Sequence, residues 1–340
     1  MLSRGLDPNN PPPDVLPFTS YVGENLVAMA PEATRLMMEA WRRDTPGDLE
    51  IRVGERRQTA QRVEEVWGEA FRGLDQLLSV CEEFGMIFAH RLRDAKGDLP
   101  FTLRVLIGLF TRGVQVGEET FHLLRGGFAA GAEGRWRTLH ELAVVAWFIA
   151  NHGDRTAERY MLHNDVHVER SMRLEQRHHE ALRMEPYTKQ EMDDAQKDVR
   201  ELRKRFGRVF ETDYGWAAAD MGFKKEDRHG PTFADLERRL GATHFRPLYS
   251  SASHNIHASV HGLVSNPSQV PDRTPMLLTR GSEYGIRMPA ANTMVSLQML
   301  AHTLLGYWSL PHDLIGLKTL AALVEEVAQE FASCEKRLDA

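Results

Sequence analysis

The chain has 340 residues, of which 42% are hydrophobic and 26% are charged, a composition typical of a globular protein. Its formal net charge of −6 argues against a surface that is basic throughout, so an RNA partner would need a local basic patch. The two cysteines, Cys81 and Cys334, lack the spacing of a metal site or a redox pair, which predicts a cytoplasmic location.

Hydrophobic residues recur with helical periodicity along almost the whole chain. This predicts an all-α fold, a multi-helix bundle with long antiparallel helices. Residues 1–30, which include a run of three prolines, are predicted to form an extended N-terminal arm, and residues 31–340 a single helical domain. In the first part of that domain, a polar break at 44–54 is expected to separate two helices, 33–43 and 58–93.

The remaining elements are expected to be helices joined by short polar or glycine-rich segments, with an irregular insertion at about 207–241. A small-residue turn at 126–134 is expected to join the first two helices into a hairpin, and a strongly charged helix is expected at 188–206. The expected helices after residue 100 are 101–124, 135–151, 154–184, 188–206, 245–263, 289–308 and 313–338.

Residues 290–310 contain no charged side chain over a length that could span a bilayer. Several polar side chains, including Asn292, Ser296 and His302, interrupt this stretch. That density of polar groups predicts a helix buried inside the bundle, and no membrane contact is expected.

The first candidate site lies in the apolar helix at 135–151. Arg137 and Glu141 are four residues apart, so they share one helix face and can form an ion pair. Arg135 and His140 have the bare Arg-x4-His spacing of a ribonuclease motif.

The second candidate site combines Tyr249, Ser253 and His257, which follow one another at four-residue intervals. A helix would place these three side chains along one face. The segment is polar around most of its circumference, which is unusual for a helix that only packs.

Four groups of residues resemble motifs of an all-helical bacterial family catalogued as a domain of unknown function. They are Arg137-Thr-Leu-His-Glu141, Ala157-Glu-Arg-Tyr160, Tyr214-Gly-Trp216 and Tyr249-x3-Ser253-x3-His257. The resemblance covers roughly residues 60–310. It implies a helical bundle whose Arg, Glu, Tyr, Ser and His positions converge, and it implies no established activity.

The Arg135-x4-His140 spacing is also similar to that of HEPN proteins, helical bundles that cleave RNA, often across a dimer interface. This likeness implies a metal-independent ribonuclease or phosphodiester-acting enzyme of bacterial stress or antiphage defence, with RNA as partner and a homodimer as assembly. His140 would transfer protons and Arg135 would stabilise the phosphorane charge. Trp136 departs from the polar residue that commonly follows the arginine. The catalytic residues expected on this reading are Arg135, Arg137, His140, Glu141, Tyr249, Ser253 and His257.

A metal site is an alternative, because Glu119-x2-His122 and Glu175-x2-His178 flank Glu141 in an order similar to di-iron bundles. With a turn centred near residue 130, Glu119 and Glu141 would lie at one level, whereas Glu175 and His178 would fall about 16 Å further along. This disfavours a di-iron site. The main prediction is a chain without a cofactor, and the alternative is a site for a single Zn or Fe ion. The expected ligands of that ion, besides Glu141, are Glu119, His122, His163 and His167.

The other alternative is a non-catalytic helical binding or regulatory module. In that case the same polar residues form a buried network, and the charged helix 188–206 contacts a protein partner. A solvent-accessible cleft beside these residues would favour an enzyme or a ligand site, whereas sealed and mutually bonded side chains would favour a structural network.

Overall fold

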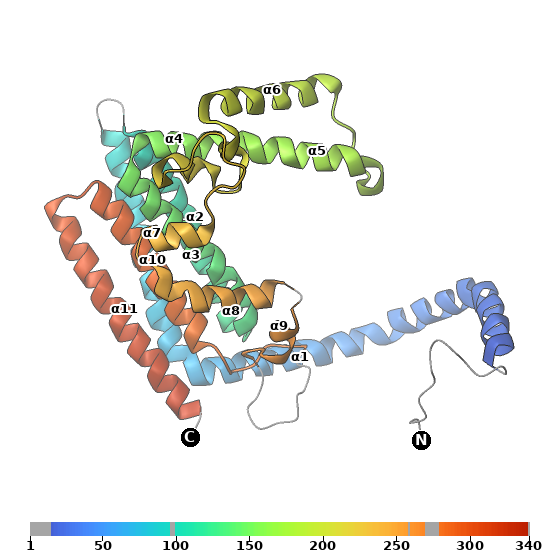
Figure 1. The fold of residues 1–340 in the computed structure, drawn as a ribbon. Helices are drawn as coiled ribbons and strands as arrows, with labels where there is room; N and C mark the ends of the chain where they lie inside the picture. The colour runs from blue at the N-terminus through green and yellow to red at the C-terminus, as the bar shows by residue number, and fades with distance from the viewer. Residues whose placement is uncertain (1–14, 96–98, 258, 269–278, 339–340) are drawn as a thin grey trace. The chain divides into compact units, whose positions relative to one another are not determined.

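The computed structural model describes residues 15–95, 99–257, 259–268 and 279–338 (Figure 1). The regular structure within these ranges consists of eleven α-helices and three short 3-10 helices, without a strand. The all-α fold predicted from hydrophobic periodicity is confirmed. Contacts divide the chain into two compact units, residues 1–58 and 59–340.

The first unit is helical wherever the structure describes it. Helix α1 (Val15–Asp94) begins at residue 15, so the prediction of an extended arm at 1–30 is wrong from that position on, and its earlier part lies outside the described residues. The polar break expected at 44–54 is helical as well. Arginine and glutamate are good helix formers, and Arg35 pairs along the helix with both Glu32 and Glu39, each at 2.6 Å.

The second unit begins where side chains first become buried. None of the side chains at 30–58 is buried, and Thr59 is the first described residue that is. The start of the helical domain predicted from the sequence was residue 31. In the structure the second unit begins at residue 59. Helical periodicity predicts only that a segment is helical, whereas a compact unit also needs side chains that bury apolar surface.

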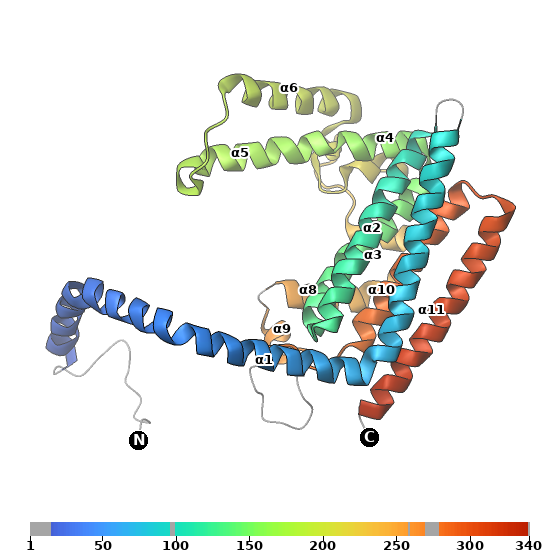
Figure 2. The ribbon, with the colours of Figure 1, turned by 180° about the vertical axis from the view of Figure 1, so that it is seen from behind.

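The core of the second unit is built from long helices packed along one another (Figure 2). Trp67 of α1 contacts Phe331, with ring centroids 5.8 Å apart, and Phe71 contacts Phe121 edge to face at 6.0 Å. These contacts join the second half of α1 to the other core helices. The other helices of this core are α2 (Phe101–Arg125), α3 (Ala129–His152), α10 (Arg287–Tyr307) and α11 (Pro311–Leu338).

Helix α10 lies inside this core, as its polar but uncharged sequence predicted. Thr293 and Ser296 are fully buried, and both have hydrogen-bond partners. The Thr293 hydroxyl donates to the carbonyl of Pro289 (2.7 Å), and the Ser296 hydroxyl accepts from the indole of Trp136 (3.0 Å). Among the described helices, none is both long and apolar enough to cross a bilayer.

The turn between α2 and α3 is shorter than the sequence suggested. Helix α2 ends at Arg125 and α3 begins at Ala129, whereas a turn over 126–134 was expected. Gly127 adopts a φ of +76°, and the amide of Phe128 returns to the carbonyl of Leu123 (2.8 Å), which closes the helix in a left-handed C-terminal turn. The centre of the hairpin therefore moves from about residue 130 to 127.

The middle of the chain contains a helical hairpin followed by the irregular insertion. The helix expected at 154–184 is interrupted at His163, and the charged helix begins after Thr188, which forms a capping box with Glu191. The insertion contains only short elements, as expected. The elements of this region are α4 (Asp154–Leu162), α5 (Asn164–Leu182), α6 (Lys189–Phe206), η1 (Arg208–Glu211), η2 (Gly215–Met221) and α7 (Phe233–Arg239). Then follow η3 (Thr243–Phe245), α8 (Arg246–Ile256) and α9 (Val260–Val264).

Candidate functional site: an aromatic pocket beside Glu141

Three of the predicted site residues meet where α8 packs against α3. Arg137 and Glu141 form the expected ion pair along α3, with Nη2 and Oε1 3.3 Å apart. The hydroxyl of Tyr249, from α8, donates a hydrogen bond to the same Oε1. The guanidinium of Arg137 also lies over the Tyr249 ring, 4.6 Å from its centroid, a distance at which cation–π attraction operates.

These interactions leave one side of the Glu141 carboxylate available. Both Arg137 and Tyr249 engage Oε1, and no described residue bonds to Oε2. Burial, reinforced by the bond to Glu141, raises the pKa of Tyr249 to about 12, so this hydroxyl remains a hydrogen-bond donor at neutral pH. The carboxylate is thereby held in one orientation, with Oε2 as a free acceptor.

Glu141 lines a pocket of about 360 Å³. Aromatic rings from two other segments form much of its wall. Tyr160 and Trp216 contact each other edge to face, with centroids 5.1 Å apart, and burial raises the pKa of both Tyr160 and Tyr214. The residues lining this pocket, which we call the Glu141 pocket, are Thr138, Glu141, Leu142, Val145, Tyr160, His167, Asp213, Tyr214 and Trp216.

The Tyr214-Gly-Trp216 motif forms one wall of the pocket, and its glycine lies close to the backbone of Phe210. A Cβ on Gly215 would lie 2.3 Å from the carbonyl oxygen of Phe210, so a larger residue does not fit between the two aromatic residues. Arg159 of α4 donates from Nε to the carbonyl of Trp216 (2.9 Å), which fixes this segment to the helices. The insertion is therefore anchored at the point where it contributes to the pocket.

The acidic groups of the pocket are balanced by arginines. Glu141 pairs with Arg137, and Asp213 pairs with Arg170 at 3.0 Å. Each carboxylate lies beside an opposite charge, and solvent also screens Asp213, whose side chain is 82% exposed, so little net potential remains in the pocket. The pocket therefore offers a ligand aromatic rings on which to stack and one hydrogen-bond acceptor, the Glu141 carboxylate.

His140 lies in the core, away from the pocket. It is fully buried and donates from Nε2 to Oε1 of Glu237 (3.0 Å), which is itself fully buried and bonded to Arg246. Burial, with the nearby Arg246, lowers the pKa of His140 to about 4, so the ring is neutral at physiological pH. Its Nδ1 is buried without a hydrogen-bond partner among the described residues.

The structure does not bring Arg135 and His140 together. Arg135 bonds to Glu119 of α2, which also accepts from Arg112. Five residues along a helix correspond to a rotation of about 140°, so the Arg135 and His140 side chains leave α3 in different directions. An Arg-x4-His spacing on a regular helix therefore does not by itself place both side chains in one site.

Ser253 and His257 also do not join the pocket. The Ser253 hydroxyl donates to the carbonyl of Tyr249 (2.8 Å), and His257 is exposed at the C-terminal end of α8. The helix ends at Ile256, so His257 no longer follows the helical face that the four-residue spacing assumed. Of the three, only Tyr249 faces Glu141.

The four residues expected to bind a metal ion do not come together in one site. Glu119 lies level with Arg135, six residues or about 9 Å before Glu141, because the hairpin turn is centred at 127. His163 and His167 bond to each other (3.1 Å), and His167 also lines the Glu141 pocket. His122 contacts the Phe121 ring. The described ranges contain no group of three or more His, Cys, Asp or Glu side chains arranged to hold a metal ion.

Glu237, the buried partner of His140, was not predicted from the sequence. It occurs in a charged segment of α7, which suggests a solvated position. Phe233 lies four residues earlier and is buried, so Glu237 falls on the apolar face of α7. That four-residue spacing is the signal that could have identified it.

Comparison with known protein families finds a match over part of the chain. Residues 103–269 match the Family of unknown function (DUF5677). The predicted resemblance to a family of unknown function is thereby confirmed. All nine residues that line the Glu141 pocket lie within the DUF5677 segment. No curated protein and no solved structure matches the chain.

Proposed function

We propose that this chain is a helical binding module, and that the Glu141 pocket binds a flat, uncharged aromatic heterocycle with an N–H donor. The observation that carries the proposal is the Glu141 carboxylate, which lines a pocket walled by aromatic rings while Arg137 and Tyr249 engage its Oε1 and no described residue bonds to its Oε2. Of the alternatives drawn from the sequence, this is closest to the binding module.

The size and surface of the pocket fit such a ligand. A volume of about 360 Å³ is at the lower end of the range for small-molecule sites, enough for a one- or two-ring compound. Tyr160, Tyr214 and Trp216 offer aromatic surface, on which a ring gains both burial and favourable ring–ring geometry.

The charge balance favours an uncharged ligand over a cation. Aromatic side chains with carboxylates nearby also suit ammonium ligands. Here, however, Glu141 is paired with Arg137, and Asp213 is paired with Arg170 and largely exposed to solvent, so a cation would gain little attraction and would lose its hydration. A neutral N–H group satisfies Oε2 without that loss.

A matched pair of probes tests the donor. Benzimidazole carries a ring N–H, and 1-methylbenzimidazole has the same rings without it. We expect calorimetry on the full chain to detect benzimidazole and to show binding of the methylated probe weaker by about tenfold or more. If neither probe binds, or if both bind equally, the proposal is wrong.

The variant Glu141→Gln tests the acceptor. Tyr249 donates to Oε1 and the Arg137 guanidinium lies 3.3 Å from it, so both would favour the amide oxygen at that position and turn the NH2 group away from them. An acceptor then becomes a donor, and benzimidazole binding should be lost. Glu180→Gln, an exposed position on α5, is the matched control and should bind as the natural chain does.

The ribonuclease function stays a prediction of the Arg-x4-His spacing. It receives less support than the binding module, because Arg135 and His140 have separate partners. RNA cleavage by the purified chain that is lost in both Arg135→Ala and His140→Ala, with folding retained, would favour the enzyme. A protein partner for the charged helix, now α6, and a homodimer also stay predictions.

A further inference from the structure

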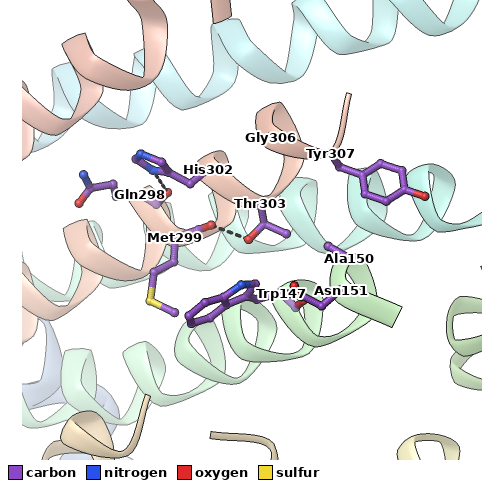
Figure 3. Close-up of a pocket in the computed structure, with 9 residues that line it drawn as sticks. All are labelled: Trp147, Ala150, Asn151, Gln298, Met299, His302, Thr303, Gly306 and Tyr307. Atoms are coloured by element: carbon purple, nitrogen blue, oxygen red, sulfur yellow. Dashed lines mark hydrogen bonds between the residues drawn. The ribbon is translucent and has the colours of Figure 1, made fainter. Parts of the chain in front are cut away.

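A second pocket lies between the C-terminal parts of α3 and α10. Its volume is about 450 Å³, and it shares no residue with the Glu141 pocket. Figure 3 shows Trp147 and Met299 toward one end and Tyr307 toward the other. The lining residues are Trp147, Ala150, Asn151, Gln298, Met299, His302, Thr303, Gly306 and Tyr307.

None of the side chains lining this pocket carries a permanent charge. The lining contains no Asp, Glu, Lys or Arg. An ionic ligand would lose its hydration here without gaining an opposite charge, so the pocket selects against ions. The class of ligand is therefore an uncharged molecule.

Three polar side chains of the pocket donate to backbone carbonyls of their own helices and keep an acceptor that a ligand can use. Asn151 donates from Nδ2 to the carbonyl of Trp147 (2.7 Å), and Thr303 donates to the carbonyl of Met299 (2.8 Å). His302 directs Nδ1 to the carbonyl of Gln298 (2.9 Å), so this nitrogen carries the hydrogen and Nε2 is an acceptor. The groups left for a ligand include Asn151 Oδ1, Thr303 Oγ1 and His302 Nε2.

The apolar part of the pocket offers a ring surface and open space. Trp147 is 36% exposed although it belongs to a core helix, and Met299 contributes a polarizable thioether of the kind that packs well on aromatic rings. A Cβ added to Gly306 would meet no atom within 4 Å. The space beside Gly306, which lines the pocket, is therefore open.

We propose that the pocket between α3 and α10 is a second ligand site, which binds a small uncharged aromatic molecule through a hydrogen-bond donor. The aromatic ring packs on Trp147 and Met299, and the donor bonds to one of the acceptors that line α3 and α10. The α10 half of this site lies outside the DUF5677 segment, so the site does not depend on the function proposed for the Glu141 pocket.

Phenol and toluene are suitable probes, because they are similar in size and only phenol carries a donor. Binding is followed on the full chain from the indole N–H resonances in two-dimensional nitrogen–proton NMR spectra, with the Trp147 signal assigned from Trp147→Phe. We expect phenol to shift the Trp147 signal saturably and toluene to bind weaker by about tenfold. A shift of Trp216 alone would report the Glu141 pocket and would count against the second site.

The variant Gly306→Leu localises the effect, because leucine would occupy the pocket. Gly108→Leu is the matched control: Gly108 is also an exposed helical glycine with no atom within 4 Å of an added Cβ, and it belongs to α2, which contributes no residue to the pocket lining. Phenol should lose affinity about tenfold or more in Gly306→Leu and keep it in Gly108→Leu. Absence of a saturable Trp147 shift in the natural chain, or equal affinity in both variants, would overturn the proposal.

Discussion

The hydroxyl of Tyr249 donates to Oε1 of Glu141 across a separation of 108 positions in the sequence. This bond joins α8 to α3 and holds the carboxylate that opens into the Glu141 pocket. Its acceptor is charged and its donor is largely buried, which makes it stronger than an ordinary surface hydrogen bond.

Removing the Tyr249 hydroxyl should weaken the fold measurably. For Tyr249→Phe we expect the free energy of unfolding to fall by about 1 kcal/mol, because Glu141 is one-third exposed and water partly replaces the lost donor. Urea denaturation measures the change. Ser253→Ala removes a hydroxyl that only bonds back to the carbonyl of residue 249, and its effect should stay within about 0.5 kcal/mol.

The buried His140 predicts a loss of stability in mild acid. Burial lowers its pKa from the ordinary value of 6.5 to about 4 in the folded chain. Between pH 4 and pH 6.5, the unfolded chain therefore binds a proton that the folded chain does not. The contribution is therefore complete above pH 6.5 and is lost as the pH falls toward 4, by about 1.4 kcal/mol per pH unit at most.

The variant His140→Gln should reduce this pH dependence. His163, whose pKa burial also lowers to about 4, contributes a second share that the variant keeps. Unfolding free energies measured between pH 7 and 4.5 give the slope, and His178→Gln, at an exposed position, should leave the slope unchanged. An unaltered slope in His140→Gln would contradict the neutral, buried histidine.

The ion pair between Arg91 and Asp313 should contribute more to stability than surface pairs do. Asp313 accepts from Arg91 at 2.5 and 2.8 Å and from the amide of Leu310 at 2.7 Å, and both side chains are nearly buried. Burial alone would raise the pKa of Asp313, but these bonds outweigh it and lower the pKa. Asp313→Ala leaves the buried Arg91 without its carboxylate and should reduce the free energy of unfolding by about 3 kcal/mol.

An exposed pair close by provides the comparison for this substitution. Arg93 and Asp94 are 68% and 71% exposed. Solvent screens such a pair, so Asp94→Ala should change the free energy of unfolding by less than about 0.5 kcal/mol. Thermal or urea unfolding of Asp313→Ala and Asp94→Ala measures both changes. Equal losses of unfolding free energy in the two variants would contradict the expected effect of burial.

Two glycines of α2 should respond in opposite directions to alanine. A Cβ on Gly113 would lie 2.3 Å from Leu300 Cδ1 of α10, so Gly113→Ala should destabilise by about 1–3 kcal/mol through overpacking. Gly108 has open space around it, and Gly108→Ala should stabilise by about 0.5–1 kcal/mol through helix propensity. Urea denaturation of the two variants tests the close packing of α2 against α10.

The helical elements could be predicted from the sequence because they depend on local periodicity. The start of α2 at Phe101 and the beginning of α6 after Thr188 follow from local patterns and were predicted correctly. The hairpin turn was misplaced by three residues, because the small residues at 129–134 fit a helix as well as a loop. That shift changed the expected neighbour of Glu119 from Glu141 to Arg135.

The site was predictable only where its members share a helix face. The Arg137–Glu141 pair follows from four-residue spacing, and its link to Tyr249 came from the family resemblance. The pairing of His140 with Glu237 joins α3 to a segment nearly 100 positions later, and no local pattern specifies such a contact. Tertiary packing therefore determined that Glu141 lines the pocket, whereas the neighbouring His140 is buried against Glu237.

One wall of the Glu141 pocket comes from the irregular insertion, whose short 3-10 segments have little stability of their own. A ligand that bridges Glu141 and Trp216 would bind only when the insertion is docked, and its binding energy would oppose local opening of that segment. Amide protons near Trp216 should consequently exchange more slowly with solvent when the pocket is occupied. Hydrogen exchange in the irregular insertion would then measure ligand binding.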